Sequence, residues 1–301
     1  MFEKVKIITS SGGKTNSDCY GFTDTAAWVI DGTSNSYVGK NNRTKTRSDI
    51  QWCAKWWSDY FYNNIHTFDK YTDLLECGAA MLFNTFDNFE KGAIPPSVSV
   101  VLLKDMGSVI KIGLLGDCGA IVKFKDQKVV YFVDQNNDML IEDLMEKAES
   151  VKENLRVLAN SPTVGSDSEI DGILISDTKA LFNTRRIIEK DMKALIEGSN
   201  PRCRFHLLRA DNSSVADLQT LMIQKDLVES VCLISDGMAQ YFNLFKIGSV
   251  EDFMSLATSV YYTKSVDIIS EYENSDLDCE KYPRLNVAND KTLLCFDIGR
   301  C

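Results

Sequence analysis

Histidine is scarce in this sequence, which limits the catalytic chemistry available to the protein. Only His66 and His206 occur in the 301 residues. A Ser-His-Asp triad or a Cys-His pair needs a histidine beside the nucleophile. His66 falls at the end of a predicted helix, and His206 falls inside an apolar strand-like segment, where a core histidine with satisfied hydrogen bonds is expected. We therefore expect no histidine-based nucleophilic catalysis.

The sequence also lacks paired cysteines, long apolar runs and a signal peptide. None of its nine cysteines forms a Cys-x-x-Cys pair. This argues against a zinc site and against a disulfide framework, and scattered buried thiols suit a reducing compartment. The N-terminus lacks the apolar core of a signal peptide, and no stretch approaches the length of a membrane helix. We expect a cytoplasmic protein that does not enter a membrane.

No excess of basic residues is present. Lysine and arginine number 33 against 43 acidic residues, which gives a formal charge of −10. A chain of this charge repels nucleic acid and anionic membrane surfaces. The acidic excess can come from a solvated surface, and it can also come from a cation site.

A nucleotide-binding loop is suggested by the stretch SSGGKTNS, Ser10 to Ser17, but the pattern is incomplete. Gly13-Lys14-Thr15 matches the end of a Walker A motif. The glycine required five residues before Gly13 is replaced by Ile8. The residues that follow do not resemble the helix whose N-terminus would face the phosphates. We do not expect an ATP or GTP site here.

Short apolar, β-branched runs alternate irregularly with helical patterns, and this order predicts the fold class. Two amphipathic helices are predicted at Asp49–Ile65 and Asp73–Phe89, followed by a strand meander between Val98 and Val133. The helical spacing also predicts a helix at Val215–Ile223. Strands and helices do not alternate regularly, so we predict an α+β fold: a layered sandwich with largely antiparallel sheets. One domain over residues 1–301 is the simplest organisation.

Aspartate residues recur at the ends of the apolar strands. They are Asp31 in WVID, Asp117 in LLGD, Asp236 in LISD and Asp290 in NDKTLL. An Asp-Gly pair commonly forms a hairpin turn, and this interpretation remains open. Carboxylates gathered at the rim of an apolar sheet would repel one another and lose solvation. Mg²⁺ and Mn²⁺ prefer such oxygen ligands, so a metal cluster is the alternative interpretation.

The ordered set of these motifs resembles the metal-dependent protein phosphatase 2C family, and its bacterial members in particular. The motifs are NSD (Asn16–Asp18), VIDG (Val29–Gly32), LLGDCGAIV (Leu114–Val122), LISDG (Leu233–Gly237) and NDKTLL (Asn289–Leu294). In the family the last motif is of the D-N-x-T type. The resemblance spans nearly the whole chain and implies a four-layer α-β-β-α sandwich with two mainly antiparallel sheets flanked by helices.

The resemblance implies roles for individual residues. Asp31 would bridge two Mn²⁺ or Mg²⁺ ions, and the Gly32 carbonyl would bind one of them. Asp236 and Asp290 would complete the second ion's ligands. Asp117, together with Asp236, would serve a third, weaker metal site. Asp18 would orient the waters bound to the metal ions.

Departures from the family pattern concern the residues around the substrate. Ser17 stands where many members have an acidic residue, and Thr33 follows Gly32 where eukaryotic members have a histidine. Many members have an arginine before the first motif; here Lys14 would hold the substrate phosphate as a point charge. The family's mobile flap corresponds to a variable region within residues 134–229, which does not indicate a substrate.

The resemblance implies a metal-dependent serine/threonine protein phosphatase, in which a metal-activated water hydrolyses phosphomonoesters of a phosphorylated protein. Two alternatives stay open. One is a regulatory or binding module with weak or no turnover, which Ser17 and the missing arginine favour. The other is a hydrolase that acts on a small phosphorylated molecule. We expect a monomer with no nucleic-acid partner.

Overall fold

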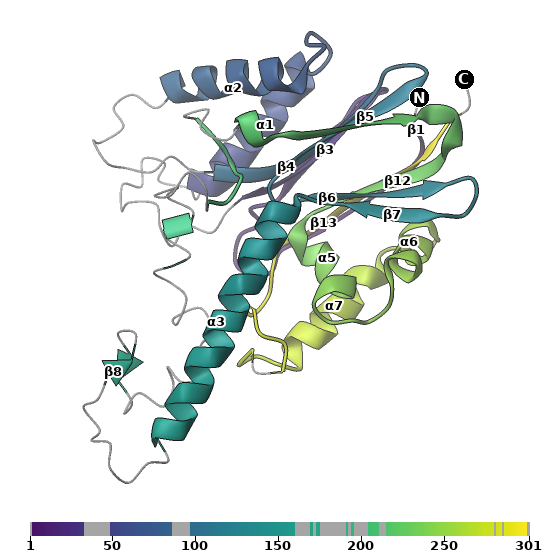
Figure 1. Ribbon diagram of the computed structural model, residues 1–301. Coiled ribbons are helices and arrows are strands. Elements are labelled where there is room, and N and C mark those ends of the chain that lie inside the picture. The colour runs from purple at the N-terminus through teal and green to yellow at the C-terminus, as the bar shows by residue number, and fades with distance from the viewer. Residues whose placement is uncertain are drawn as a thin grey trace. The chain divides into compact units, whose positions relative to one another are not determined.

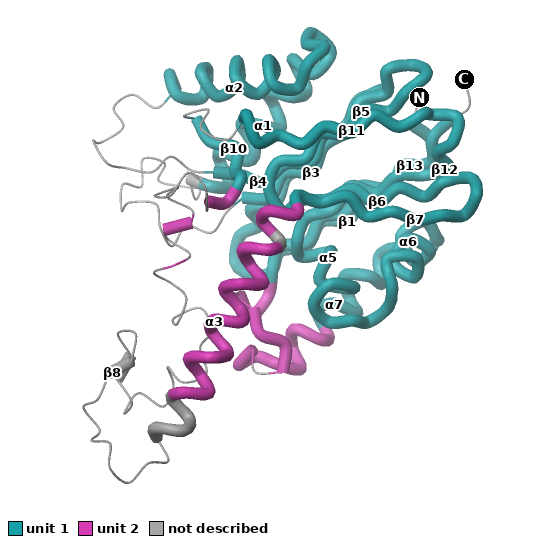
Figure 2. Tube along the Cα trace, in the orientation of Figure 1, with its two compact units in different colours: residues 1–134, 206–270, 289–301 teal, residues 135–205, 271–288 magenta. Residues whose placement is uncertain are grey.

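The computed structural model describes residues 2–32, 49–85, 97–159, 169–170, 173–174, 191, 194–195, 204–210, 215–279, 281–284 and 286–299. Contacts between residues divide the chain into two compact units (Figure 2). The first contains Met1–Asp134, His206–Ser270 and Asn289–Cys301, and the second contains Gln135–Phe205 and Glu271–Ala288. The sequence-based expectation of a single domain stays a prediction, as does a flap within residues 134–229.

One sheet of the first unit is built from strands in the order β11-β5-β4-β3-β2. These strands are β2 (Cys19–Phe22), β3 (Ala26–Gly32), β4 (Ser97–Asp105), β5 (Val109–Leu115) and β11 (Gln219–Gln224). The short β10 (Leu208–Arg209) pairs with the beginning of β4. Every pair in this sheet is antiparallel.

The other sheet of this unit has the order β1-β13-β12-β6-β7 and is also antiparallel throughout. Its strands are β1 (Phe2–Ser10), β6 (Gly119–Phe124), β7 (Val129–Phe132), β12 (Val228–Ile234) and β13 (Lys291–Ile298). The core strands are nearly continuous apolar runs because both faces of each sheet are covered; β4, for example, is buried from Ser97 to Lys104.

Helices cover the outer faces of the two sheets (Figure 1). α1 (Asp49–Asn64) and α2 (Tyr71–Thr85) pack on the first sheet around the buried Trp28, Trp57 and Phe61. A second apolar layer, which includes Val101, lies between the sheets. α5 (Asp236–Asn243) and α6 (Val250–Thr258) lie against the other sheet. The predicted α+β sandwich, two mainly antiparallel sheets flanked by helices, is confirmed.

The remaining elements are shorter or belong to the second unit. The first unit also contains η3 (Val215–Asp217), η4 (Lys225–Leu227) and the start of α7 (Lys264–Asn274). The second unit contains α3 (Gln135–Ala159) and the paired strands β8 (Glu169–Ile170) and β9 (Ile173–Leu174). Its segment 271–288 is organised by Arg284, which donates to Asp276 Oδ2 at 2.7 Å.

Three expectations from the sequence are wrong. The strands predicted as one meander between Val98 and Val133 form two hairpins, because β4 and β5 lie in one sheet and β6 and β7 lie in the other. The segment predicted as the helix Val215–Ile223 is a single 3-10 turn, η3, followed by strand β11. The apolar spacing of three and four residues is real, but pairing of β11 with β5 determines the structure. The expectation of free thiols also fails for one pair, because a disulfide joins Cys232 and Cys295 on the neighbouring strands β12 and β13.

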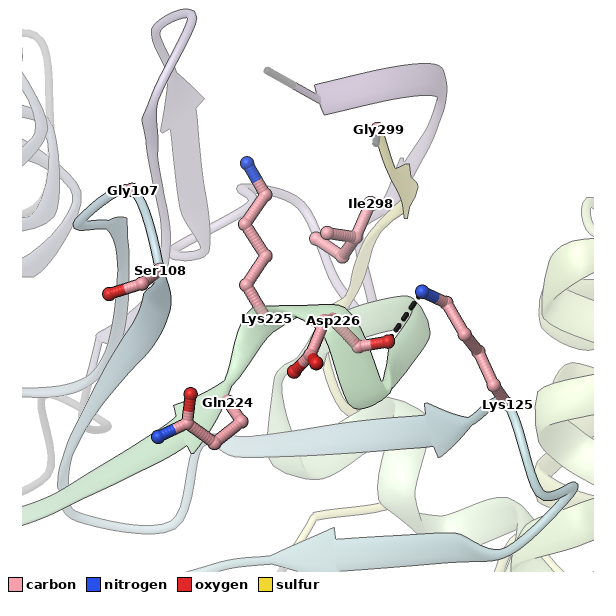
Figure 3. A pocket seen from close by; sticks show the side chains of 8 residues that line it. All are labelled: Gly107, Ser108, Lys125, Gln224, Lys225, Asp226, Ile298 and Gly299. Carbon is pink, nitrogen blue, oxygen red and sulfur yellow. Dashed lines mark hydrogen bonds between the residues drawn. The ribbon is translucent and has the colours of Figure 1, made fainter. Parts of the chain in front are cut away.

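No helix in the described part of the chain is both long enough and apolar enough to cross a membrane. A pocket of about 410 Å³ opens at one end of the first unit's strands (Figure 3). It is lined by the turn residues Gly107 and Ser108, by Lys125 and Lys225, and by the end of β13. The predicted site aspartates lie at the opposite end of these strands.

Candidate metal centre

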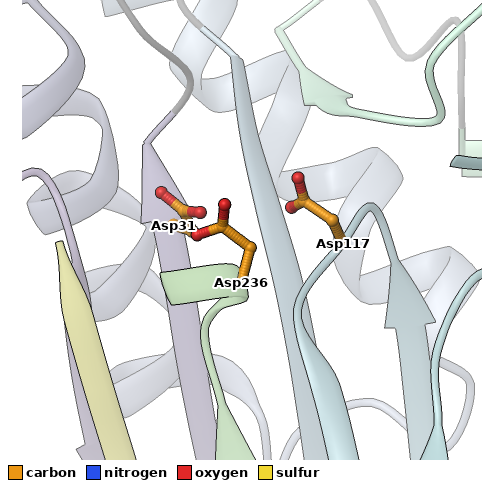
Figure 4. Close-up of side chains that lie close together, drawn as sticks. All are labelled: Asp31, Asp117 and Asp236. Atoms are coloured by element: carbon orange, nitrogen blue, oxygen red, sulfur yellow. The ribbon is translucent and has the colours of Figure 1, made fainter. Parts of the chain in front are cut away.

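Three of the predicted aspartates come together at one end of the two sheets (Figure 4). Asp31 lies near the end of β3, Asp117 lies in the turn between β5 and β6, and Asp236 is the first residue of α5. One carboxylate oxygen from each lies within 4.8 Å of the other two. These three residues therefore form a single acidic cluster, although they are almost 90 positions apart, or more, in the sequence. We call it the aspartate cluster.

The turn that carries Asp117 is tight and is held against β4. Gly116 has φ +100°, and a Cβ added to it would lie 2.3 Å from Ser99 Oγ. The Asp117 backbone N–H donates to the same Ser99 hydroxyl at 3.3 Å. Ser99 itself pairs with Asp31 across β4 and β3. One residue of β4 thus connects the backbones of two members of the cluster.

The Asp236-Gly237 pair begins a helix and does not form a hairpin turn. Ser235 is the N-cap of α5, and the Asp236 carboxylate follows it in the first helical turn. A Cβ on Gly237 would lie 2.0 Å from the backbone oxygen of Asp290, so only glycine fits this close approach. The hairpin interpretation of this pair does not describe its structure.

Protein surrounds the three carboxyl groups even though the residues themselves are only half-buried. Burial raises the pKa of Asp236 to about 8, and the charge of Asp117 adds to the effect. Burial, together with the charges of neighbouring aspartates, raises the pKa of Asp31 well above its ordinary value. Burial also raises the pKa of Asp117. Carboxyl groups held this way resist ionisation unless a positive charge is added.

Asp18 lies next to this cluster with no hydrogen-bond partner among the described residues for either carboxylate oxygen. Asp117 Oδ1 is likewise buried and unpartnered within that part of the chain. Burial raises the pKa of Asp18 to about 6. Buried carboxylate oxygens are normally satisfied, so these point to a missing donor or cation. The hard oxygen donors fit Mg²⁺ or Mn²⁺.

Asp290, which sequence reasoning placed among the metal ligands, lies outside the aspartate cluster. Its Oδ1 accepts from the backbone N–H of Gly12 at 2.8 Å, and its Oδ2 accepts from that of Ser17 at 2.5 Å. Asn289 instead faces the cluster and donates from Nδ2 to Asp236 Oδ2 at 2.9 Å. The metal-binding role of Asp290 stays a prediction.

Gly32 lies beside the end of the loop Ser11–Ser17, which also contains Lys14. Lys14 is exposed within Ser11–Ser17, the loop that Asp290 holds. A Cβ on Gly32 would lie 3.0 Å from Ser17 O, so the end of this loop abuts the end of β3. Thr33 lies outside the described residues. The phosphate-binding role of Lys14 and the metal-binding role of the Gly32 carbonyl stay predictions.

His206 has a different environment from the one expected. It precedes β10 as an irregular residue, and its side chain is 20% exposed. Its Nδ1 lies 2.8 Å from Oδ2 of Asp134, which is completely buried. Sequence reasoning missed this pair, because the two residues are 72 positions apart and neither belongs to a motif.

Comparisons with known proteins find similarity in structure and none in sequence. No family profile and no curated protein matches the chain. The serine/threonine phosphatase Stp1 from Staphylococcus aureus matches with a TM-score of 0.53 at 10% identity, over 100% of this chain and 96% of that one. A bacterial serine phosphatase matches with a TM-score of 0.52 at 10% identity, over 99% of both chains.

A third similar structure is the catalytic domain of the serine/threonine phosphatase PstP, which was crystallised with two manganese ions. It matches with a TM-score of 0.52 at 9% identity, over 99% of both chains. The chain therefore has the fold of these bacterial phosphatases along nearly its whole length.

Proposed function

We propose that this protein is a metal-dependent serine/threonine protein phosphatase. The observation that supports the proposal most directly is the aspartate cluster, in which three carboxylate oxygens lie within 4.8 Å of one another. The raised pKa values of Asp31 and Asp236 add that the ionised form of the cluster is favoured only when a cation is bound. The likeness in fold to bacterial serine/threonine phosphatases supports the proposal.

Each residue would have a role that its position allows. Asp31, Asp117 and Asp236 would hold Mn²⁺ or Mg²⁺, two ions and a third, weaker one, with the Gly32 carbonyl contributing. Bound cations would neutralise the phosphate charge and acidify a water. Asp18, with its unpartnered oxygens, would accept hydrogen bonds from nearby water and keep it oriented. Lys14 would contact the phosphate from the exposed loop.

A second candidate function is a regulatory module on the same fold with weak or no turnover. The observation that favours it is the position of Asp290, whose carboxylate is bound by the Gly12 and Ser17 backbones. An uncharged asparagine stands beside Asp236 instead. A centre with one charge fewer binds cations less tightly, so turnover in this candidate would be weak.

The test compares hydrolysis of p-nitrophenyl phosphate with Mn²⁺, with Mg²⁺ and with EDTA, in the wild type and in Asp236→Asn. Asp126→Asn is the matched control, because this exposed aspartate lies in the turn between β6 and β7, away from the cluster. Metal binding is measured in parallel by calorimetry. We expect metal-dependent turnover in the wild type and the control, and none in Asp236→Asn.

Other outcomes separate the alternatives. Metal binding without turnover would favour the regulatory module, and absence of both would refute a metal centre. A phosphoserine peptide and small phosphorylated metabolites are then compared as substrates. Faster turnover of the peptide supports a phosphoprotein substrate. The proposal includes a cytoplasmic monomer. Light scattering would measure its mass.

A further inference from the structure

His206 and Asp134 form a pair whose geometry resembles an oriented proton donor. His206 Nδ1 lies 2.8 Å from Asp134 Oδ2, and Gln219 Nε2 donates to Asp134 Oδ1 at 3.0 Å. Both carboxylate oxygens are therefore occupied, and the Asp134 side chain is completely buried. A carboxylate fixed in this way accepts a hydrogen bond from a protonated Nδ1 and so sets the orientation of the imidazole ring.

The topology of the sheets brings this pair to the turn that carries Asp117. β3 occupies one side of β4, so β10, which His206 precedes, shares the other side with the end of β5. β6 leaves the Asp117 turn, and β7 returns beside it and ends two residues before Asp134. Gln219 begins β11 opposite Leu114, near the end of β5.

Electrostatics agree with this placement. The charge of Asp134 contributes to the raised pKa of Asp117, after the larger contribution of burial. The other ring nitrogen of His206, Nε2, lies 3.9 Å from Asp217 Oδ2. The His206 side chain is 20% exposed, so solvent reaches part of it.

We infer that His206 donates a proton to the leaving oxygen of the phosphorylated substrate, and that Asp134 is its positioning residue. This inference rests on the proposed phosphatase function. As the water oxygen forms its bond to phosphorus, the bond between phosphorus and the serine oxygen breaks, and its electron pair goes to that oxygen. His206 supplies the proton. The attacking water releases one proton to solvent, and solvent reprotonates His206.

The experiment compares two substrates whose leaving groups differ in their need for a proton. The p-nitrophenolate ion leaves without protonation, whereas a serine alkoxide leaves only with it. His206→Asn keeps an amide that can reach Asp134 and removes the titratable ring. General acid catalysis contributes roughly 10²- to 10⁴-fold, so we expect kcat to fall by about 100-fold or more on a phosphoserine peptide. On p-nitrophenyl phosphate we expect kcat to change only a few-fold.

The matched control is His66→Asn, which removes an exposed histidine bonded to Thr23 at the end of α1. It should leave both substrates unaffected. Asp134→Asn should also lower turnover, and the loss should again be larger on the phosphoserine peptide than on p-nitrophenyl phosphate. A readout independent of activity is the imidazole N–H proton of His206 in the metal-free protein. Its NMR signal should be strongly downfield in the wild type and in His66→Asn, and lost in Asp134→Asn.

Three outcomes would overturn the inference. Equal loss on both substrates would assign His206 a structural role, and no loss on either would assign it none in the reaction. In both cases metal-dependent turnover by the wild type leaves the phosphatase function standing. If the wild type hydrolyses neither substrate with either metal, the phosphatase function fails, and the inference fails with it.

Discussion

Asn289 donates a hydrogen bond from Nδ2 to Oδ2 of Asp236 at 2.9 Å, while its neighbour Asp290 faces the loop Ser11–Ser17. Two adjacent polar residues thus serve different parts of the site. Asn289 contributes an uncharged group beside the aspartate cluster. The charged Asp290 carboxylate accepts hydrogen bonds from the backbone of the loop that carries Lys14.

Asn289→Asp should strengthen metal binding. The substitution adds a carboxylate beside Asp236, and two unit charges 4 Å apart interact by about 4 kcal/mol at an effective dielectric of 20. Desolvation offsets part of this, so we expect Mn²⁺ to bind about tenfold more tightly by calorimetry. Asn63→Asp, which adds the same charge on an exposed part of α1, is the control. Unchanged affinity would place the bound ion away from Asn289.

Asp290→Ala should loosen the loop and leave metal binding nearly unchanged. Hydrogen bonds to a charged group contribute about 1.5–3 kcal/mol each, and Asp290 accepts backbone bonds from Gly12 and Ser17. We expect the free energy of unfolding in urea to fall by about 2–3 kcal/mol, with faster hydrogen exchange at both amides. Asp126→Ala, which removes a carboxylate bonded to one exposed turn amide, should cost about 0.5 kcal/mol. Loss of metal binding in Asp290→Ala would instead make Asp290 a ligand.

The metal-free protein should become less stable as pH rises from about 5 to 8.5. Burial raises the pKa of Asp18 to about 6 and that of Asp236 to about 8 in the folded state. Between pH 4 and 8 the folded protein holds protons that the unfolded chain has released, so rising pH favours unfolding. The stabilisation is complete below the unfolded pKa, near 4, and is lost as pH passes the folded values.

Melting temperatures measured in EDTA across this range test the expectation. Saturating Mn²⁺ should remove the loss at alkaline pH, since the cation takes the place of the protons. Asp236→Asn should flatten the part of the curve near pH 8. A melting temperature that stays constant or rises between pH 5 and 8.5 in EDTA would contradict the raised pKa values.

Lys104→Met should destabilise the fold through the end of α1. The buried Lys104 ammonium donates to the backbone oxygens of Ile65 at 3.1 Å and Phe68 at 3.0 Å. Methionine fills the volume but leaves both carbonyls without this donor, which costs about 1–3 kcal/mol. Urea unfolding measures the change. Lys123→Met is the control, because its more exposed ion pair with Glu229 contributes below about 1 kcal/mol. Equal losses in the two variants would refute the assigned role.

Much of the fold could be predicted from the sequence because its core strands are apolar, short and bounded by polar turns. The predicted strand Ala26–Ile30 agrees with β3 to within two residues. The strands predicted between Val98 and Val133 appear as β4 to β7, although they form two hairpins in different sheets and not one meander. The edge strand β11 could not be predicted. Most of its residues are exposed, so burial imposes little pattern on its sequence, and pairing with β5 defines it.

The residues of the site likewise include some that the sequence could predict and some that it could not. Asp31 lies near the end of a buried strand, and Asp117 and Asp236 come just after one, so the sheets dictate where their carboxylates meet. Asn289 and Asp290 lie in one polar segment before β13, and only packing decides which of them faces the cluster. The close approach of Gly237 to the Asp290 backbone fixes that choice. His206 and Asp134 carry no local pattern, because their meeting depends on three separate strand ends.

Strand β1 pairs with β13, from Phe2 opposite Ile298 to Ser10 opposite Lys291. Such sequence-distant pairing gives the fold a high contact order, and domains of this kind fold in about milliseconds to seconds. During synthesis on the ribosome, β1 must wait for β13 to emerge before it has its partner. Newly made chains therefore expose the edge of β1 until β13 has emerged. Chaperones that shield unpaired strands should affect the yield of this protein more than its final stability.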